Sequence, residues 1–336
     1  MSASNVQEFA MQWPNIKDGS THELTYYNEG STHLWVSGMM DNCLAKVTWD
    51  GQATYHPMPD GSQPHGLKYD GKGSPWVSLE YRGTIARLNE DGEIQEEIDV
   101  KMDVRGSAPI NPHPHGFTFA HDGETIWFTG KKTNTVGKIN PDRSVEHFEL
   151  PTVGAVLIYL SPGPDGNIYG TELVGNNILI VTPEGDITEK EIPTYNSRPI
   201  AIVPGPDGKS MWFSQEAGNK VGRLDIETQV ITQYSVPMSQ KNAILGGMAF
   251  DKAGNLWTHS YINQHDKDPA GADYVIKMDK AINNAPAGDL STVPVTHYEV
   301  PSRNTVMHRI LQGADGNIWF TELGTDKLGK LTVGGY

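Results

Sequence analysis

Short apolar runs of four to six residues recur along the chain and are separated by polar turns rich in glycine. Each repeat contains a first strand, a strand of the I-W-F-T type, a strand of the x-G-K-I type and a strand that often ends in proline. Seven second-strand aromatics, 41 to 62 residues apart, mark the copies: Trp35, Trp76, Trp127, Tyr169, Trp212, Trp257 and Trp319. This spacing fits four strands per copy. It predicts an all-β chain that forms a single seven-bladed β-propeller over residues 1–336.

Two further features define the repeat and its closure. Asp-Gly pairs such as Asp122-Gly123 and Asp165-Gly166 supply the positive φ that a tight hairpin turn needs. Fourth strands are predicted at 53–59, 94–100, 145–151, 187–193, 231–237 and 295–301. Only six of the seven copies are followed by a fourth strand, because the last copy ends on its third strand. Residues 6–11 fit the pattern of the missing fourth strand. We therefore expect residues 6–11 to form the outer strand of the last blade and to close the ring.

The sixth blade is longer than the others by about 20 residues, which predicts an insertion over residues 261–294. It includes the polar stretch N-Q-H-D-K-D at 263–268. A long insertion in a propeller forms either a lid over one face or an inert surface loop. The sequence leaves both interpretations open.

Composition narrows the classes of partner. The formal net charge of −15 disfavours binding to nucleic acid or to anionic lipid, and no basic run offsets it. No window approaches the ~20 apolar residues of a membrane span, and the first residues lack the features of a signal peptide. We expect a cytoplasmic monomer that acts on a small molecule. Cys43 is the only cysteine and is expected to be a buried structural residue.

The first strand of each blade lines the axis of a propeller, so equivalent positions in the copies form a ring. Aligning the copies on the turn and the aromatic residue gives these hub positions: His22, His65, His115, Ile158, Ile200, Gly246 and His308. Histidine supplies 12 of 336 residues but four of these seven positions. Because an imidazole can take and return a proton near neutral pH, the four histidines are predicted to be catalytic. His22 reaches its position only if the first blade's turn holds one extra residue.

Two blades carry a resemblance to a known family. The second reads Q-P-H-G-L at 63–67 and W-V-S-L-E at 76–80, and the third begins H-P-H-G-F at 113–117. With the G-P-D-G turns and the N-K-V-G-R-L and I-T-Q-Y-S-V-P strands, the chain resembles the streptogramin B lyase (virginiamycin B lyase) family over nearly its whole length. That family's active blade reads E-P-H-G-I…W-F-x-x-E. The resemblance implies that His65 is the proton-transferring residue, and that Gln63 and Glu80 stand where two glutamates hold Mg²⁺.

The resemblance extends to neighbouring blades with some departures. It implies that His22 matches a second family histidine and that His115 stands where the family has a tyrosine. Gln63 is a neutral ligand in place of a carboxylate, so it would bind metal more weakly. His113 precedes His115 by two residues, so strand alternation would put both on one face, where His113 could replace the lost ligand. His308 has no counterpart, and the family's active blade is the last in its chain instead of the second.

These patterns predict a metal-assisted lyase that opens an ester or lactone by β-elimination. The substrate can be a cyclic ester. His65 is the expected base, and Glu80, Gln63 and His113 are the expected ligands of a divalent cation, Mg²⁺ by resemblance. Three alternatives remain open. The same metal can activate water in a lactonase or esterase. Four imidazoles suit Fe(II), Zn or Cu better than Mg²⁺, as in a metal oxygenase. A non-catalytic binding propeller would carry no metal. Glu172, Glu322 and His259 are expected to be structural.

Overall fold

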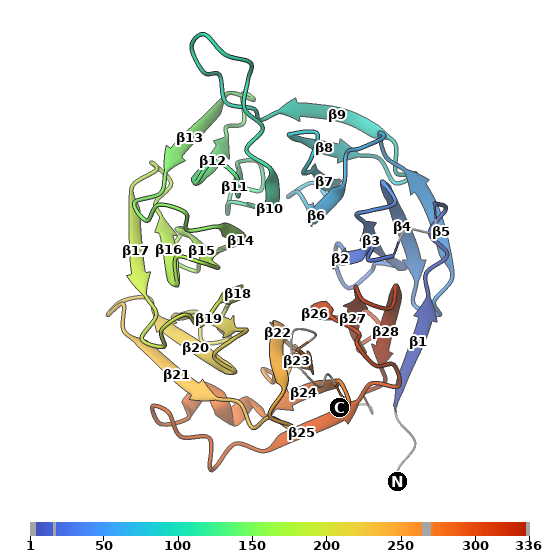
Figure 1. Ribbon diagram of the computed structural model, residues 1–336, viewed down its shortest axis with the longest axis vertical. Helices are drawn as coiled ribbons and strands as arrows, with labels where there is room; N and C mark the ends of the chain where they lie inside the picture. Colours follow the sequence, from blue (N-terminus) through green and yellow to red (C-terminus); the bar gives the residue numbers. More distant parts are fainter. Residues whose placement is uncertain (1–4, 16–17, 264–269, 334–336) are drawn as a thin grey trace.

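The computed structural model describes residues 5–15, 18–263 and 270–333. Within these ranges the strands form seven four-stranded antiparallel sheets, which surround a central axis as the blades of a propeller (Figure 1). The predicted all-β, seven-bladed architecture is thereby confirmed. One strand of each blade lies nearest the axis, and the other three follow outward in sequence order, except that β1 is the outermost strand of the last blade.

The first four blades follow the chain. The first contains β2 (Thr21–Thr25), β3 (His33–Gly38), β4 (Cys43–Thr48) and β5 (Ala53–Pro57). The second contains β6 (Pro64–Tyr69), β7 (Pro75–Leu79), β8 (Thr84–Leu88) and β9 (Ile94–Asp99). The third contains β10 (Pro114–Phe119), β11 (Ile126–Gly130), β12 (Thr135–Ile139) and β13 (Val145–Glu149). The fourth contains β14 (Leu157–Pro162), β15 (Ile168–Glu172), β16 (Asn177–Val181) and β17 (Ile187–Glu191).

The last three blades complete the ring. The fifth contains β18 (Pro199–Pro204), β19 (Ser210–Gln215), β20 (Lys220–Asp225) and β21 (Ile231–Ser235). The sixth contains β22 (Ala243–Phe250), β23 (Leu256–Ile262), β24 (Tyr274–Met278) and β25 (Val295–Glu299), with the short 3-10 helix η1 (Lys280–Asn284) before β25. The seventh combines β26 (Met307–Gln312), β27 (Ile318–Glu322) and β28 (Lys327–Leu331) with β1 (Val6–Ala10).

The aromatic residue of each second strand is the centre of the packing between blades. All seven aromatics identified in the sequence are at most 2% exposed. Trp212, for example, packs with Tyr234 of its own blade and with Leu256 of the next. Each blade thus buries its apolar face against its neighbour, as repeat architectures require. Replacing one such tryptophan by alanine would cost about 3–5 kcal/mol of stability.

The N-terminal strand closes the ring as predicted. β1 pairs antiparallel with β28 from Val6↔Leu331 to Ala10↔Lys327. The observed fourth strands end one or two residues before the predicted ends. Proline occupies five of the predicted ends, and it has no N–H to continue a ladder.

Further contacts hold β1 within the last blade and join the last blade to the first. Phe9 stacks on Trp319 with ring centroids 5.7 Å apart. The carboxylate of Asp326 accepts backbone N–H groups from Gly19 and Thr21, at 2.9 and 2.8 Å. The last blade is therefore fixed to the first blade as well as to the N-terminal strand.

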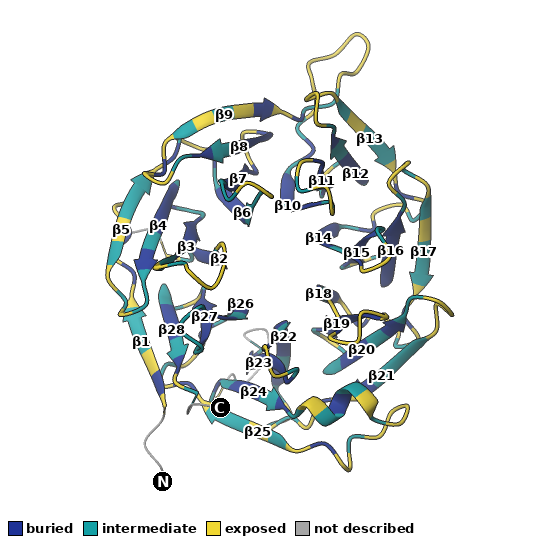
Figure 2. Cartoon of the chain, turned by 180° about the vertical axis from the view of Figure 1, so that it is seen from behind, coloured by how far each residue is buried: buried dark blue, intermediate teal, exposed yellow. Residues whose placement is uncertain are grey.

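The extra residues of the sixth blade are divided between two connections, on either side of β24. Residues 264–269 of the predicted insertion lie outside the described residues. In the second connection, Ile282 of η1 packs with Trp212 and Leu256, and the hydroxyl of Tyr234 donates to the carbonyl of Ala285 at 3.1 Å. This part covers the periphery of the fifth and sixth blades (Figure 2) and not the axis, so it is no lid. Among the described residues, no helix has the length and apolar character needed to cross a bilayer.

Cys43 is a structural residue of β4. Its side chain is buried, and its thiol donates to the carbonyl of His56 at 3.3 Å. Burial raises the pKa of the Cys43 thiol to about 11, so the reactive thiolate is scarce at neutral pH. The expected buried cysteine is confirmed.

Closure by β1 predicts that deleting residues 1–12 lowers the melting temperature of the whole domain, because the last blade loses its outer strand and the ring its clasp. Thermal unfolding followed by circular dichroism measures the change. Gln7→Ala, on the exposed side of β1, is the control and should leave the melting temperature nearly unchanged. If the deletion variant melts at the same temperature as the full-length protein, closure of the ring by β1 is contradicted.

Candidate active site

Each inner strand carries a β-bulge at its hub position. In β6, Pro64 pairs with Leu79 and Leu67 pairs with Val77, so His65 and Gly66 together face one residue of β7. The same register shift spans the hub position in all seven inner strands of the described ranges. A bulge redirects a side chain and increases the local twist. Here it brings the hub side chains to the axis.

A hydroxyl on the second strand holds the bulge and reaches the next blade. Ser78 Oγ accepts the N–H of Gly66 at 2.8 Å and donates to the carbonyl of His115 at 3.2 Å. Thr321 acts in the same way across the junction of the last and first blades, where it donates to the carbonyl of His22 at 2.7 Å. The spacing between hub residues is therefore set by hydrogen bonds from these hydroxyls to the backbone.

In the sixth blade, an imidazole replaces that hydroxyl. His259 faces the bulge of β22, and its Nε2 accepts the N–H of Gly247 at 3.1 Å. A Cβ on Gly246 would overlap the imidazole of His259, so this hub position must be glycine. Burial lowers the pKa of His259 to about 3, which keeps the ring neutral. These contacts give His259 the structural role expected of it.

The four hub histidines form a continuous row across four consecutive blades. The ring centroids of His308 and His22 are 3.7 Å apart, those of His22 and His65 4.1 Å, and those of His65 and His115 3.6 Å. His22, His65 and His115 are buried, whereas the side chain of His308 is 26% exposed. The structure thus brings together the four predicted histidines, including His22. We call them the histidine row.

The histidine row is electrically neutral at neutral pH. Burial is the main cause that lowers the pKa of each imidazole well below its usual value, and the positive charge of Arg309 adds to it. Within the described residues, both ring nitrogens of His65, Nδ1 of His22 and Nε2 of His308 have no hydrogen-bond partner. Their lone pairs are available for a proton or a metal ion.

Glu80 follows β7 and lies beside the histidine row. Its carboxylate is 3% exposed, and Oε1 lies 3.3 Å from Nζ of Lys131 and 3.7 Å from Nδ1 of His113. Burial raises the pKa of Glu80, and Lys131 opposes this shift. Single ligand atoms of His65, Glu80 and His115 lie within 4.8 Å of one another, close enough for one cation. The structure therefore places Glu80 next to His65.

The other two predicted ligands, Gln63 and His113, directly precede the inner strands β6 and β10. The carbonyl of Gln63 accepts the N–H of Glu80 at 3.3 Å, so the two backbones are adjacent. His113 precedes β10 and has a φ of 57°. The strand alternation expected for His113 and His115 therefore does not apply, because His113 lies in a left-handed turn. It contacts Glu80 from that turn.

Three charged residues near the histidine row were missed by the sequence analysis. Lys131 follows β11 at the position that Glu80 has after β7. Glu23 and Arg309 directly follow His22 and His308, at the bulge position where the second and third blades have glycine. The sequence did contain a signal for Glu23 and Arg309: a charged residue follows the hub histidine in two blades, whereas glycine follows it in the other two.

Glu23 and Arg309 form a buried ion pair, with Oε1 and Nε 2.5 Å apart. The same oxygen lies 3.9 Å from Nδ1 of His22 and 3.7 Å from Nε2 of His308. The guanidinium of Arg309 also stacks over the ring of Tyr159, 4.8 Å from its centroid. The histidine row is thus bordered by two ion pairs, Glu80 with Lys131 and Glu23 with Arg309.

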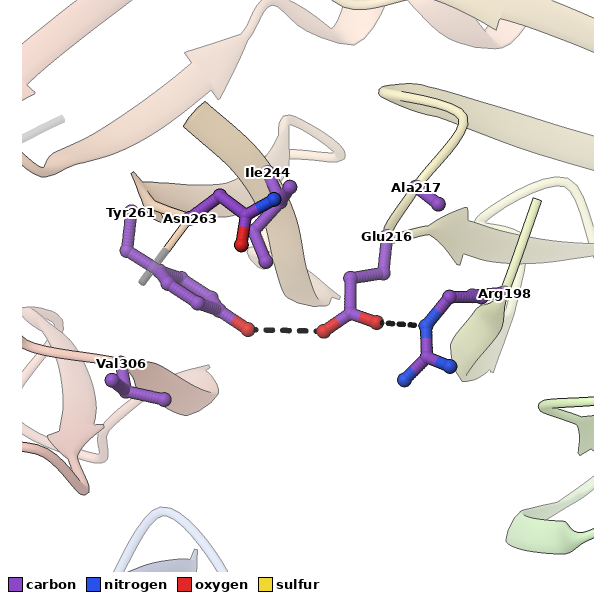
Figure 3. A pocket seen from close by; sticks show the side chains of 7 residues that line it. All are labelled: Arg198, Glu216, Ala217, Ile244, Tyr261, Asn263 and Val306. Carbon is purple, nitrogen blue, oxygen red and sulfur yellow. Dashed lines mark hydrogen bonds and ion pairs between the residues drawn. The ribbon is translucent and has the colours of Figure 1, made fainter. Parts of the chain in front are cut away.

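A cavity of about 470 Å³ opens on the fifth to seventh blades. Glu216 bridges its polar side, accepting from the hydroxyl of Tyr261 at 3.2 Å and from Nε of Arg198 at 2.7 Å (Figure 3). Arg198 and Glu216 hold the same strand positions as Gln63 and Glu80, so the cavity opens on the same face of the ring. The complete lining is Arg198, Glu216, Ala217, Ile244, Tyr261, Asn263 and Val306.

Two buried glutamates of the repeat have structural partners. Glu172 accepts a hydrogen bond from Asn177 at 2.9 Å, and Glu322 accepts one from Thr325 at 2.7 Å. Burial raises the pKa of Glu172 to about 8 and that of Glu322 to about 7. Their contacts agree with the structural role expected for both.

Comparisons with known proteins agree on the fold and the family. The family model of the virginiamycin B lyase family matches residues 4–267, a range that includes the second and third blades. No curated protein matches the sequence. A structure of streptogramin B lyase is 23% identical, with a TM-score of 0.80, and the match covers 98% of this chain and 97% of that one.

Two structures from Staphylococcus aureus are also similar. Virginiamycin B lyase, in selenomethionine form, is 25% identical with a TM-score of 0.76. A catalytically inactive variant of that lyase with quinupristin is 26% identical with a TM-score of 0.78. Each match covers 98% of this chain and 99% of the other.

The buried neutral imidazoles predict that the protein loses stability in acid. The unfolded chain binds a proton at each histidine below about pH 6.5, whereas the folded chain resists it, so the free energy of unfolding falls as the pH falls below 6.5. In His65→Asn, this slope should be smaller by up to about 1.4 kcal/mol per pH unit. Urea unfolding between pH 5 and 8 measures it. Near pH 8 the free energy of unfolding should depend on pH equally in the wild type and in His65→Asn. Equal pH dependence below pH 6 would contradict a buried, neutral His65.

Proposed function

Because the chain belongs to the virginiamycin B lyase family, we propose that it is a carbon–oxygen lyase that opens an ester or lactone by β-elimination. One observation carries the proposal: His65 is buried and neutral, its ring nitrogens lack protein partners, and it lies next to the buried carboxylate of Glu80. A base beside a site for positive charge is the minimum requirement for removing a weakly acidic C–H proton.

His65 would act as the base. Its imidazole takes the proton from the carbon next to a carbonyl, and the electron pair of that C–H bond forms a carbon–carbon double bond. The C–O bond of the ester breaks at the same time or directly afterwards, and the leaving oxygen keeps its electron pair as a carboxylate. The depressed pKa of His65 keeps its lone pair free before the reaction.

The neighbours of His65 in the row would position it and exchange its proton. His22 and His115 flank it, with centroids 4.1 and 3.6 Å away. Nδ1 of His115 lies 3.1 Å from the carbonyl of Ile158, which fixes this ring. His22 has an unpartnered Nδ1 and is the better placed of the two to receive the proton from His65.

Glu80, with Gln63 and His113 beside it, would hold the divalent cation. When bound, a cation such as Mg²⁺ polarises the carbonyl of the substrate and stabilises the enolate-like charge. Glu80 is the single carboxylate of this set, and the ammonium of Lys131 already lies 3.3 Å from it. We therefore expect weak cation binding, with Lys131 supplying part of the positive charge.

The cavity on the fifth to seventh blades would accommodate the remainder of the substrate. It lies on the same face as Glu80 and combines apolar Ile244 and Val306 with the polar Glu216 (Figure 3). A related lyase has been crystallised with quinupristin. A small ester with apolar substituents is the substrate class that this cavity fits.

The test is a kinetic comparison on an ester or lactone with an acidic hydrogen. His65→Ala should lower kcat by about 10²–10⁴-fold, the usual worth of a positioned base, and should leave the circular dichroism spectrum unchanged. Deuterium at the abstracted position should slow wild-type turnover. His297→Ala, on the outer strand β25, is the matched control and should keep full activity. Full activity in His65→Ala would overturn the proposal.

A further inference from the structure

A second set of ligand atoms lies on the axis, on the side of the histidine row away from His115. One nitrogen each of His22, His65 and His308 and one carboxylate oxygen of Glu23 all lie within 4.8 Å of one another. These four side chains come from the seventh, first and second blades. We call them the axial quartet. Glu80 does not belong to it.

The imidazoles of the axial quartet have ring nitrogens without hydrogen-bond partners. Glu23, His22 and His65 are 7%, 6% and 1% exposed. Within the described residues, Nδ1 of His22, both nitrogens of His65 and Nε2 of His308 have no hydrogen-bond partner, whereas Oε1 of Glu23 is paired with Arg309. Buried polar atoms without a partner cost stability, and proteins rarely leave several together. A bound cation would satisfy them at once.

We propose that the axial quartet is a four-coordinate site for a borderline divalent ion of the Zn²⁺ class. Neutral imidazoles and a carboxylate are the ligands that Zn²⁺ and its transition-metal neighbours prefer, whereas Mg²⁺ prefers an all-oxygen set. Four protein ligands make a closed site of the structural kind. Because the ligands come from both sides of the junction between the last and first blades, the ion stabilises the closed ring.

Arg309 competes with the ion for Glu23. Its Nε lies 2.5 Å from Oε1, the oxygen that faces His22 and His308. The metal therefore displaces the guanidinium from that oxygen when it binds. This gives the site an unusual property: removing a neighbouring cationic side chain strengthens metal binding, since it relieves both the competition and the like-charge repulsion.

The axial quartet shares His65 with the proposed base. A metal ion on His65 occupies the lone pair that takes the proton, so Zn²⁺ inhibits elimination. This consequence alone rests on the proposed function. Binding of the ion rests only on the geometry of the quartet, and it is measured without substrate.

The experiment is calorimetric titration of EDTA-treated full-length protein with Zn²⁺, supported by the absorption spectrum of bound Co²⁺. We expect one tightly bound ion per chain and a higher melting temperature. His308→Gln and Glu23→Gln should each weaken Zn²⁺ binding by roughly tenfold or more, because each removes a ligand. Arg309→Gln should strengthen it. The matched controls are Glu80→Gln, a buried carboxylate outside the quartet, and His297→Gln, a histidine on the outer strand; both should keep wild-type affinity.

His308→Gln is the decisive variant, because this side chain is partly exposed and its loss is the least harmful to folding. Wild-type affinity in folded His308→Gln would overturn the proposal, as would wild-type protein that binds no Zn²⁺. If Zn²⁺ binding is lost in Glu80→Gln but kept in His308→Gln, the ion is bound at Glu80 and the proposal of the axial quartet is also overturned. Inactivity of the protein on esters would overturn the proposed lyase while leaving these binding results unaffected.

Discussion

The shift of register in the inner strands is the constraint on which the site depends. Where two residues of an inner strand face one residue of the next strand, the hub side chain is turned to the axis. Hydroxyls such as that of Ser78 then fix the bulge and bond to the backbone of the following blade. The imidazoles of His65 and His115 lie 3.6 Å apart because their backbones are joined in this way.

The same geometry explains the electrostatics of the axis. The chain carries a net charge of −15, yet the histidine row is neutral because desolvation lowers the pKa of each imidazole and the positive charge of Arg309 adds to this shift. The two carboxylates that border the row are each compensated by a cation, Glu80 by Lys131 and Glu23 by Arg309. The resemblance implies that Gln63 stands where the family has a glutamate, and Lys131 supplies positive charge beside Glu80.

The sequence predicted the fold well because each blade repeats a strong local signal. The second-strand tryptophans and the Asp-Gly turns set the number of blades, and residues 6–11 supplied the missing strand. The hub alignment found His22, His65, His115 and His308, since equivalent positions of a repeat occupy equivalent places. Glu23 and Arg309 were missed because two-residue alternation predicts that the residue after a hub histidine points away from the axis. The bulge breaks this alternation, and the hydrophobic repeat does not encode a bulge.

The fate of solvent oxygen tests the central claim, that the histidine row removes a proton and does not activate water. Elimination breaks the C–O bond without adding water, whereas hydrolysis places a solvent oxygen in the product. Turnover of an ester or lactone in ¹⁸O-water, followed by mass spectrometry, distinguishes the two. The account predicts an unlabelled product that contains a new carbon–carbon double bond. Incorporation of ¹⁸O into a saturated product would contradict it and would identify a hydrolase.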